Sequence, residues 1–71
     1  MNRRHHTKLV HEGAYAAEVD VELIEADDGW SPYLSLDDAN KLDTVREALR
    51  RGDIQAASRH ARVFSLTPVL P

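Results

Sequence analysis

Three carboxylates that recur at every second position are the residues of this sequence best suited to binding: Glu18, Asp20 and Glu22. They alternate with apolar residues over the stretch from Tyr15 to Glu25, which is the period of a half-buried β-strand. All three side chains would therefore lie on one face of that strand, about 7 Å apart. Such a row can bind a cation or an arginine-rich protein surface, or it can form the solvated face of an antiparallel sheet.

A second group of candidates is aromatic. Trp30 and Tyr33 lie three positions apart, on either side of Pro32, in a chain with few aromatic residues. Because Trp and Tyr are enriched at the hot spots of protein interfaces, this pair predicts a contact with a partner. The alternative is that the two rings cap one end of a small core.

The third group of candidates is basic: Arg46, Arg50, Arg51 and Arg59. Basic residues on a helix can contact the phosphate groups of nucleic acids. The acidic isoelectric point of about 5.7 argues against a dedicated nucleic-acid-binding protein. Two acids, Glu47 and Asp53, also interrupt the basic group.

Catalytic and metal-binding patterns are missing from the sequence. The four histidines (His5, His6, His11 and His60) form no His-x-x-x-His pair, and no serine has a Gly-x-Ser-x-Gly setting. The Asp27-Asp28-Gly29 stretch lacks the spaced ligands of a calcium loop. The chain has no cysteine, which excludes disulfides and cysteine-based zinc sites. We therefore expect no enzymatic activity, no metal and no cofactor.

The length of 71 residues predicts one small domain with a limited core. Without disulfides or metals, self-association is the expected supplement, and we predict a homodimer formed through a sheet edge or through the Trp30 segment. No apolar run is long enough for a membrane span or a signal peptide. The sequence thus predicts a soluble, cytoplasmic protein.

Charge is divided into three blocks along the chain. Residues 1–8 carry three Lys or Arg residues and no acid, residues 9–40 carry nine acids and no Lys or Arg, and residues 41–71 carry six Lys or Arg residues and three acids. This pattern has two interpretations. The two ends can neutralise the middle within the chain, or the acidic middle can bind a basic partner.

The predicted fold is α+β, with the order β-β-α-α-β. Residues 1–7 are expected to be a flexible basic arm and residues 8–71 a single domain. Lys8–His11 and Tyr15–Glu25 would form a hairpin with Gly13 in its turn. Residues 30–34 would be an extended segment, because Pro32 cannot donate a hydrogen bond to a central strand.

The helical part of the fold follows from cap residues and periodicity. Ser35 should cap a helix over residues 36–51 that ends at Gly52, and Asp53 should cap a shorter helix over residues 54–60. Residues 62–67 alternate again and predict a last strand. The expected core consists of these residues: Tyr15, Val19, Val21, Leu23, Leu42, Val45, Leu49, Ile54 and Phe64.

Three stretches carry a resemblance to a known group: Tyr15-Ala-Ala-Glu-Val-Asp-Val-Glu-Leu, Gly29-Trp-Ser-Pro-Tyr-Leu-Ser-Leu-Asp-Asp-Ala and Val45-Arg-Glu-Ala-Leu-Arg-Arg-Gly-Asp-Ile. Over most of its length the chain resembles small uncharacterised bacterial proteins, some of which look like antitoxins of type II toxin–antitoxin pairs. This resemblance implies a non-enzymatic protein that binds and blocks a small basic toxin.

Three functional hypotheses follow. The first is a protein-binding module, such as an antitoxin, that uses the carboxylate row together with Trp30 and Tyr33. The second is a small regulatory nucleic-acid-binding protein that uses the four arginines. The third is a dimeric accessory protein.

Overall fold

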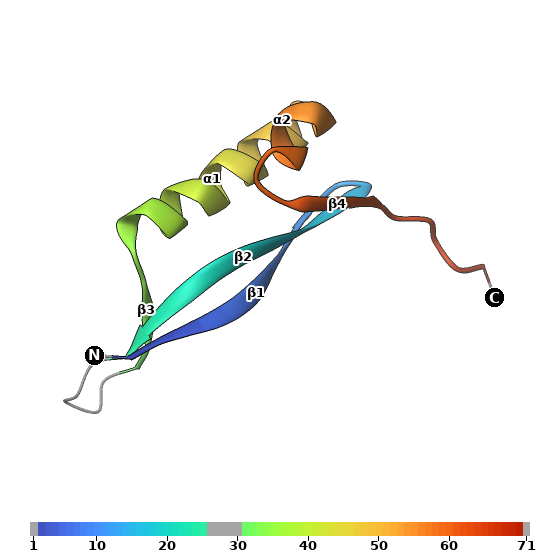
Figure 1. Cartoon of the computed structure of the whole chain (residues 1–71). Coiled ribbons are helices and arrows are strands. Elements are labelled where there is room, and N and C mark those ends of the chain that lie inside the picture. The colour runs from blue at the N-terminus through green and yellow to red at the C-terminus, as the bar shows by residue number, and fades with distance from the viewer. Residues whose placement is uncertain (1, 26–30, 71) are drawn as a thin grey trace.

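The computed structural model describes residues 2–25 and 31–70. Its elements follow the order β1-β2-β3-α1-α2-β4 (Figure 1). The small antiparallel sheet and the two helices confirm the predicted α+β class. The one addition to the predicted order is the short strand β3 (Tyr33–Leu34), which lies in the segment expected to be extended.

A long hairpin forms the body of the sheet. The strands β1 (Asn2–Glu12) and β2 (Tyr15–Glu25) pair antiparallel in an unbroken register, from Asn2 opposite Glu25 to Glu12 opposite Tyr15. Gly13, at the first position of the connecting turn, has a φ of 58°. This left-handed conformation is the one for which a hairpin turn uses glycine, and the predicted hairpin is confirmed.

The first strand is longer than the predicted Lys8–His11, because β1 already begins at Asn2. Residues 2–7, expected to be a flexible arm, are instead paired with the second half of β2. The physical reason is that β2 continues well past Val19, the partner of Lys8, and its backbone groups there need hydrogen-bond partners. The side chains of residues 2–9 are all exposed. The sequence of this part of β1 therefore lacks the alternation of apolar and polar residues that predicts a strand.

The helix α1 (Leu36–Arg50) begins where the cap residue predicts. The Ser35 hydroxyl accepts a hydrogen bond from the backbone N–H of Asp38 at 3.1 Å. Gly52, with a φ of 72°, takes the left-handed conformation that commonly follows a helix. Among the described residues, no helix is long and apolar enough to cross a membrane.

The helix α2 (Ile54–Ser58) is capped by Asp53, whose carboxylate accepts from the N–H of Ala56 at 3.1 Å. It ends two residues before the predicted boundary. Ala48 of α1 and Ala57 of α2 are both completely buried. Their small side chains allow the two helices to pack closely.

Both helices lie on one face of the sheet, so the core is a single layer between them and the hairpin (Figure 1). Of the predicted core, four residues are buried, namely Val19, Val21, Val45 and Leu49, and four are half-buried, namely Tyr15, Leu23, Leu42 and Ile54. The prediction was wrong for Phe64, which is 47% exposed. The strand β4 (Arg62–Ser65) places it opposite Ala16, on the sheet face without helices.

Candidate functional site

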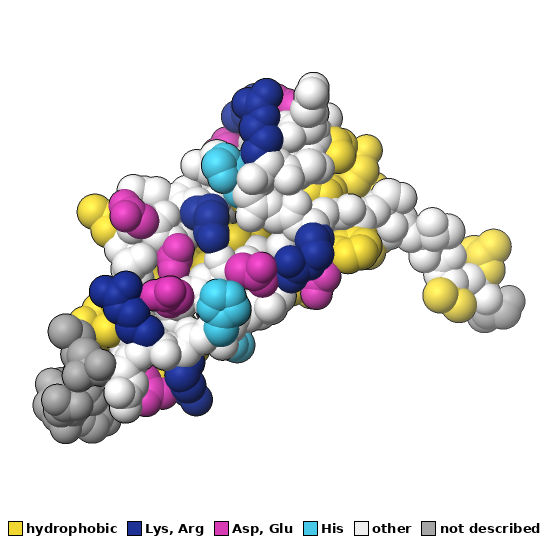
Figure 2. All heavy atoms as spheres, viewed as in Figure 1, with side chains coloured by type: hydrophobic (Ala, Val, Ile, Leu, Met, Phe, Trp, Pro, Cys, Tyr) yellow, Lys and Arg dark blue, Asp and Glu magenta, His cyan; other side chains and the backbone are white. Residues whose placement is uncertain are grey.

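The predicted carboxylate row lies on the sheet face that carries no helix, which we call the outer face. Glu18, Asp20 and Glu22 alternate along β2 with the buried residues of the core. Their partners on β1 are Leu9, Thr7 and His5. Figure 2 shows acidic and basic side chains interleaved over the visible surface, with no large patch of one sign.

The carboxylates of the row are paired with cations of the same chain. Arg62, on β4, donates both Nη1 and Nη2 to the carboxylate of Asp20 at 3.1 Å and Nε to Glu18 at 3.4 Å. Arg3, on β1, donates to Glu22 at 3.1 Å. The Arg62 guanidinium lowers the pKa of Asp20 below its ordinary value, mainly through the hydrogen bonds it donates. Arg3 and Arg62, from the two ends of the chain, thus neutralise the carboxylate row.

The two aromatic candidates differ in what the structure describes. Trp30 lies outside the described residues. Tyr33, in β3, is 48% exposed and pairs with Ile24 of β2. Its position at one end of the outer face separates it from Phe64, which pairs with β2 at the other end.

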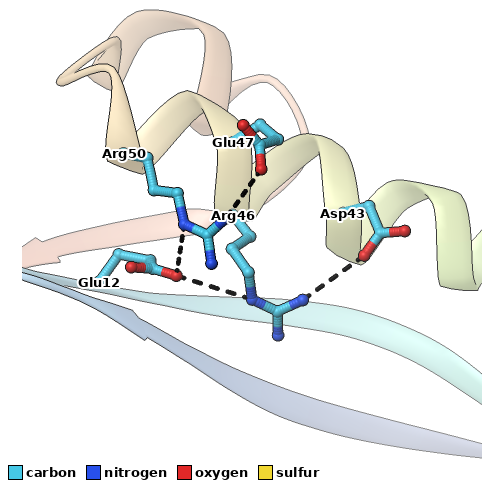
Figure 3. Close-up of polar contacts among 5 residues, drawn as sticks. All are labelled: Glu12, Asp43, Arg46, Glu47 and Arg50. Atoms are coloured by element: carbon cyan, nitrogen blue, oxygen red, sulfur yellow. Dashed lines mark hydrogen bonds and ion pairs between the residues drawn. The ribbon is translucent and has the colours of Figure 1, made fainter.

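Most arginines of the predicted basic site are paired with carboxylates of the same chain, as Figure 3 shows for Arg46 and Arg50. Arg50 donates to Glu12 at 3.1 Å and to Glu47 at 2.9 Å. Arg46 lies 3.8 Å from Glu12 and 3.5 Å from Asp43. These contacts attach α1 to the end of β1, beside the hairpin turn.

Ion pairing extends over most of the chain. Of its nine Lys and Arg residues, seven form ion pairs within the chain: Arg3, Arg4, Lys41, Arg46, Arg50, Arg51 and Arg62. Lys8 and Arg59 form none with the described residues. Of the predicted nucleic-acid site, only Arg59, at the C-terminal end of α2, therefore has no ion pair with the part of the chain that the structure describes.

The second edge of β2 is divided between two short strands. β4 pairs with residues 15–18 and β3 with Leu23 and Ile24. Within the described part of the chain, the intervening residues 19–22 have no strand partner on this edge. Two side chains of α1 contact the backbone there: Lys41 donates to the carbonyl of Asp20, and Asp38 accepts from the N–H of Glu22 at 2.8 Å.

These two contacts also fix the direction of the backbone groups in β1. The carbonyl of Asp20 and the N–H of Glu22 point away from β1, toward α1. In an antiparallel ladder, the residues opposite such positions also turn their N–H and C=O groups away from the pair. Thr7, opposite Asp20, and His5, opposite Glu22, therefore direct their backbone groups toward the other edge of β1. By alternation, Arg3, Leu9 and His11 do the same.

This edge of β1, which we call the β1 edge, has no strand partner among residues 2–25 and 31–70. Among the residues that the structure describes, β1 has β2 as its one strand neighbour. The unbroken register leaves no bulge that would twist the edge away, and β1 contains no proline. Proteins usually shorten, bend or cover such an edge, because its unpaired N–H and C=O groups can pair with another chain.

A first strand limited to Lys8–His11, as predicted, does not present this edge. One signal in the sequence indicates the longer strand. A hairpin with a two-residue turn forces the two strands into a symmetric register, so an eleven-residue second strand implies a first strand that begins near residue 2.

The structure also locates the remaining groups that could carry chemistry. His5 and His11 lie on the outer face, His6 on the opposite face of β1, and His60 after α2. Within residues 2–25 and 31–70, no three or more His, Asp or Glu side chains are grouped so that they could hold a metal ion. One open depression, beside the hairpin turn, is lined by residues that include Glu12, Tyr15 and Arg50.

Comparison of the chain with protein-family models, with curated proteins and with solved structures gives no match. The geometry described above is therefore what a functional proposal can rest on.

Proposed function

We propose that the chain is a non-enzymatic protein-binding module that binds an extended segment of a partner protein along the β1 edge. Strand addition of this kind is a recurring mode of peptide recognition, in which main-chain hydrogen bonds supply affinity and side chains supply specificity. The observation that carries the proposal is the eleven-residue strand β1, which within the described part of the chain is hydrogen-bonded to a strand on one side only.

An exposed apolar side chain at this edge supports the proposal. Leu9, whose side chain is 68% exposed, lies on the outer face of β1. Phe64 lies on the same face but on β4, with β2 between it and β1. A strand added to β1 would cover Leu9, and it would bury apolar surface in addition to forming main-chain hydrogen bonds.

The antitoxin role implied by the family resemblance is one member of this class of function. Its basic toxin would have to displace Arg62 and Arg3 from the carboxylate row or use another surface, because these carboxylates already have cationic partners. Nucleic-acid binding has less support, since three of its four predicted arginines are paired with acids.

A proline substitution can test the proposal without removing a hydrogen bond between β1 and β2. Thr7→Pro deletes an N–H that points away from β2, and proline is tolerated on edge strands in this orientation. Thr7→Val is the matched control, because it also removes the bond between the Thr7 hydroxyl and Asp20 but keeps the N–H. The experiment is an affinity purification from host lysate with wild-type, Thr7→Pro and Thr7→Val baits, compared by quantitative mass spectrometry.

We expect a partner that is retained by the wild type and by Thr7→Val and is lost with Thr7→Pro. Circular dichroism should show that all three baits are folded. Equal retention by the three folded baits would mean that the partner does not use the β1 edge, and the proposal would then be abandoned.

A further inference from the structure

We infer that the segment bound at the β1 edge is acidic, with carboxylates at alternate positions that face the helix-bearing side of the sheet. This inference rests on the proposed function and specifies its ligand. It follows from the charges on β1, from their distribution between the two faces, and from the ion pairs that these charges already form.

The charges of β1 are of one sign over nearly its whole length. It contains Arg3, Arg4 and Lys8, together with three histidines, and its single acid is the last residue, Glu12. Glu12 is bound to Arg50 and lies near Arg46 at the hairpin turn. Residues 2–11 of the β1 edge are therefore all basic or neutral.

The two faces of β1 would present different surfaces to an added strand. Val10 belongs to the core, so the residues at even positions before it, Arg4, His6 and Lys8, share the helix-bearing side of the sheet. Leu9, Thr7, His5 and Arg3 lie on the outer face, where Arg3 already donates to Glu22. An added strand would thus meet two cations and a histidine on one side, and on the other a row whose one Lys or Arg residue is already paired with an acid.

The two cations on the helix-bearing side can still accept a carboxylate. Lys8 has no ion pair with any described residue. Arg4 uses its Nε for Glu25, at 2.7 Å, and its two terminal guanidinium nitrogens form no ion pair with the described residues, so that they can bind a carboxylate of a partner. Because directly opposed unlike charges stabilise neighbouring strands, carboxylates at positions facing Lys8 and Arg4 would strengthen pairing.

Charge also opposes two other occupants. A second copy of β1 would add three Lys or Arg residues to an edge that already carries three, and a basic segment would likewise add positive charge. Like charges on neighbouring strands repel each other. The charge of the β1 edge therefore disfavours self-pairing and favours an acidic strand.

Direct binding of synthetic peptides tests this inference. The probe is an end-blocked peptide, Thr-Glu-Val-Glu-Val-Glu-Thr, whose pattern is the same in both chain directions. Its controls carry Gln or Lys in place of every Glu. Binding is measured by NMR titration up to millimolar peptide, with the backbone amides of Thr7 and Leu9 as reporters, at low salt and at about 0.5 M NaCl.

We expect the Glu peptide to bind roughly two- to thirtyfold more tightly than the Gln peptide at low salt, which is the range that two unlike cross-strand pairs give. The Lys peptide should bind more weakly than both. High salt should reduce the preference, and so should Lys8→Glu. Arg59→Glu, which makes the same charge change at the other unpaired cation, should leave the preference unaltered.

The outcomes separate the inference from the proposed function. If the Glu and Gln peptides bind equally and Thr7→Pro abolishes both, the edge is a binding site but acid selection is wrong. If the chain instead forms dimers whose interface protects Thr7, the occupant is a second copy and the inference is overturned. If no peptide shifts the Thr7 and Leu9 amides, strand addition at this edge is itself refuted.

Discussion

The carboxylate of Asp38 accepts a hydrogen bond from the backbone N–H of Glu22 at 2.8 Å. Lys41, from the same helix, donates a hydrogen bond to the carbonyl of Asp20. In the gap between β3 and β4, side chains of α1 thus form the hydrogen bonds to β2 that a neighbouring strand would otherwise form. The gap on this edge of β2 is thus closed by side chains, whereas no described strand pairs with the opposite edge of the sheet, along β1.

Asp38→Ala should therefore lower the free energy of unfolding by about 1–3 kcal/mol, because it leaves the partly buried N–H of Glu22 without its acceptor. Asp37→Ala is the control, since Asp37 also lies in the first turn of α1 but is exposed. Its loss should cost about 1 kcal/mol or less, from the helix dipole alone. Urea denaturation of both variants measures the difference, and equal costs would contradict the role assigned to Asp38.

Hydrogen exchange should alternate along β1 in the free protein. The amides of His6 and Lys8 donate toward β2 and should be protected, while those of Thr7 and Leu9 face the open edge and should exchange rapidly. Residue-resolved NMR exchange measurements test this pattern. Protection of Thr7 and Leu9 in a monomeric sample would show that something in the chain already covers the β1 edge.

Core and outer-face residues should respond differently to truncation. Val45 lies in α1 and is completely buried. Val45→Ala should therefore lower the free energy of unfolding by about 2 kcal/mol, through lost burial and the cavity left behind. Phe64→Ala removes a much larger side chain, yet it should cost about 1 kcal/mol or less because Phe64 lies half-exposed on the outer face. Thermal and urea denaturation of both variants measure the two costs. A larger cost for Phe64→Ala than for Val45→Ala would contradict the prediction.

The ion pair between Asp20 and Arg62 predicts a pH dependence of stability. The pKa of Asp20 is lowered in the folded state by the hydrogen bonds from Arg62, so its contribution is present above the unfolded pKa of about 3.9 and is lost as the pH falls through the lower folded value. Asp20→Asn should therefore be less stable than the wild type at pH 6, and the difference should shrink toward pH 3.

The cause of this effect can be checked in a second background. In Arg62→Gln, the main group that lowers the pKa of Asp20 is gone while Thr7 and His5 remain, so the stability difference caused by Asp20→Asn should narrow less with falling pH than it does in the wild-type background. Narrowing of the same size without Arg62 would assign the pH dependence to another neighbour.

Local signals in the sequence were sufficient for much of the fold. Ser35, Gly52 and Asp53 mark helix boundaries through hydrogen bonds or backbone angles that depend on nearby residues, and the structure has them at those positions. The position of Phe64 could not be predicted from such local signals. Alternation shows that a strand has two faces, but which face meets the helices depends on the register of β4 against β2.

The candidate site was predicted less well, because its chemistry depends on pairing between distant residues. Alternation correctly places Glu18, Asp20 and Glu22 on one face, but Arg62 reaches Asp20 across 42 positions of sequence. The sequence raised mutual neutralisation as one of two interpretations of its charge blocks, and the ion pairs support that one. Nothing in the local pattern distinguishes a carboxylate row with cationic partners from a row without them.

The pairing of β4 with β2 has a consequence for the order in which the molecule opens. The hairpin and the helices form from contacts close in sequence, whereas the contact between Arg62 and Glu18 closes a loop that spans 44 positions. Ordering such a loop costs entropy, and β4, with four residues, provides little pairing to offset it. Local unfolding should therefore start at β4 and carry residues 66–70 with it, so that residues 15–18 of β2 transiently lose their partner on one edge while they stay paired with β1.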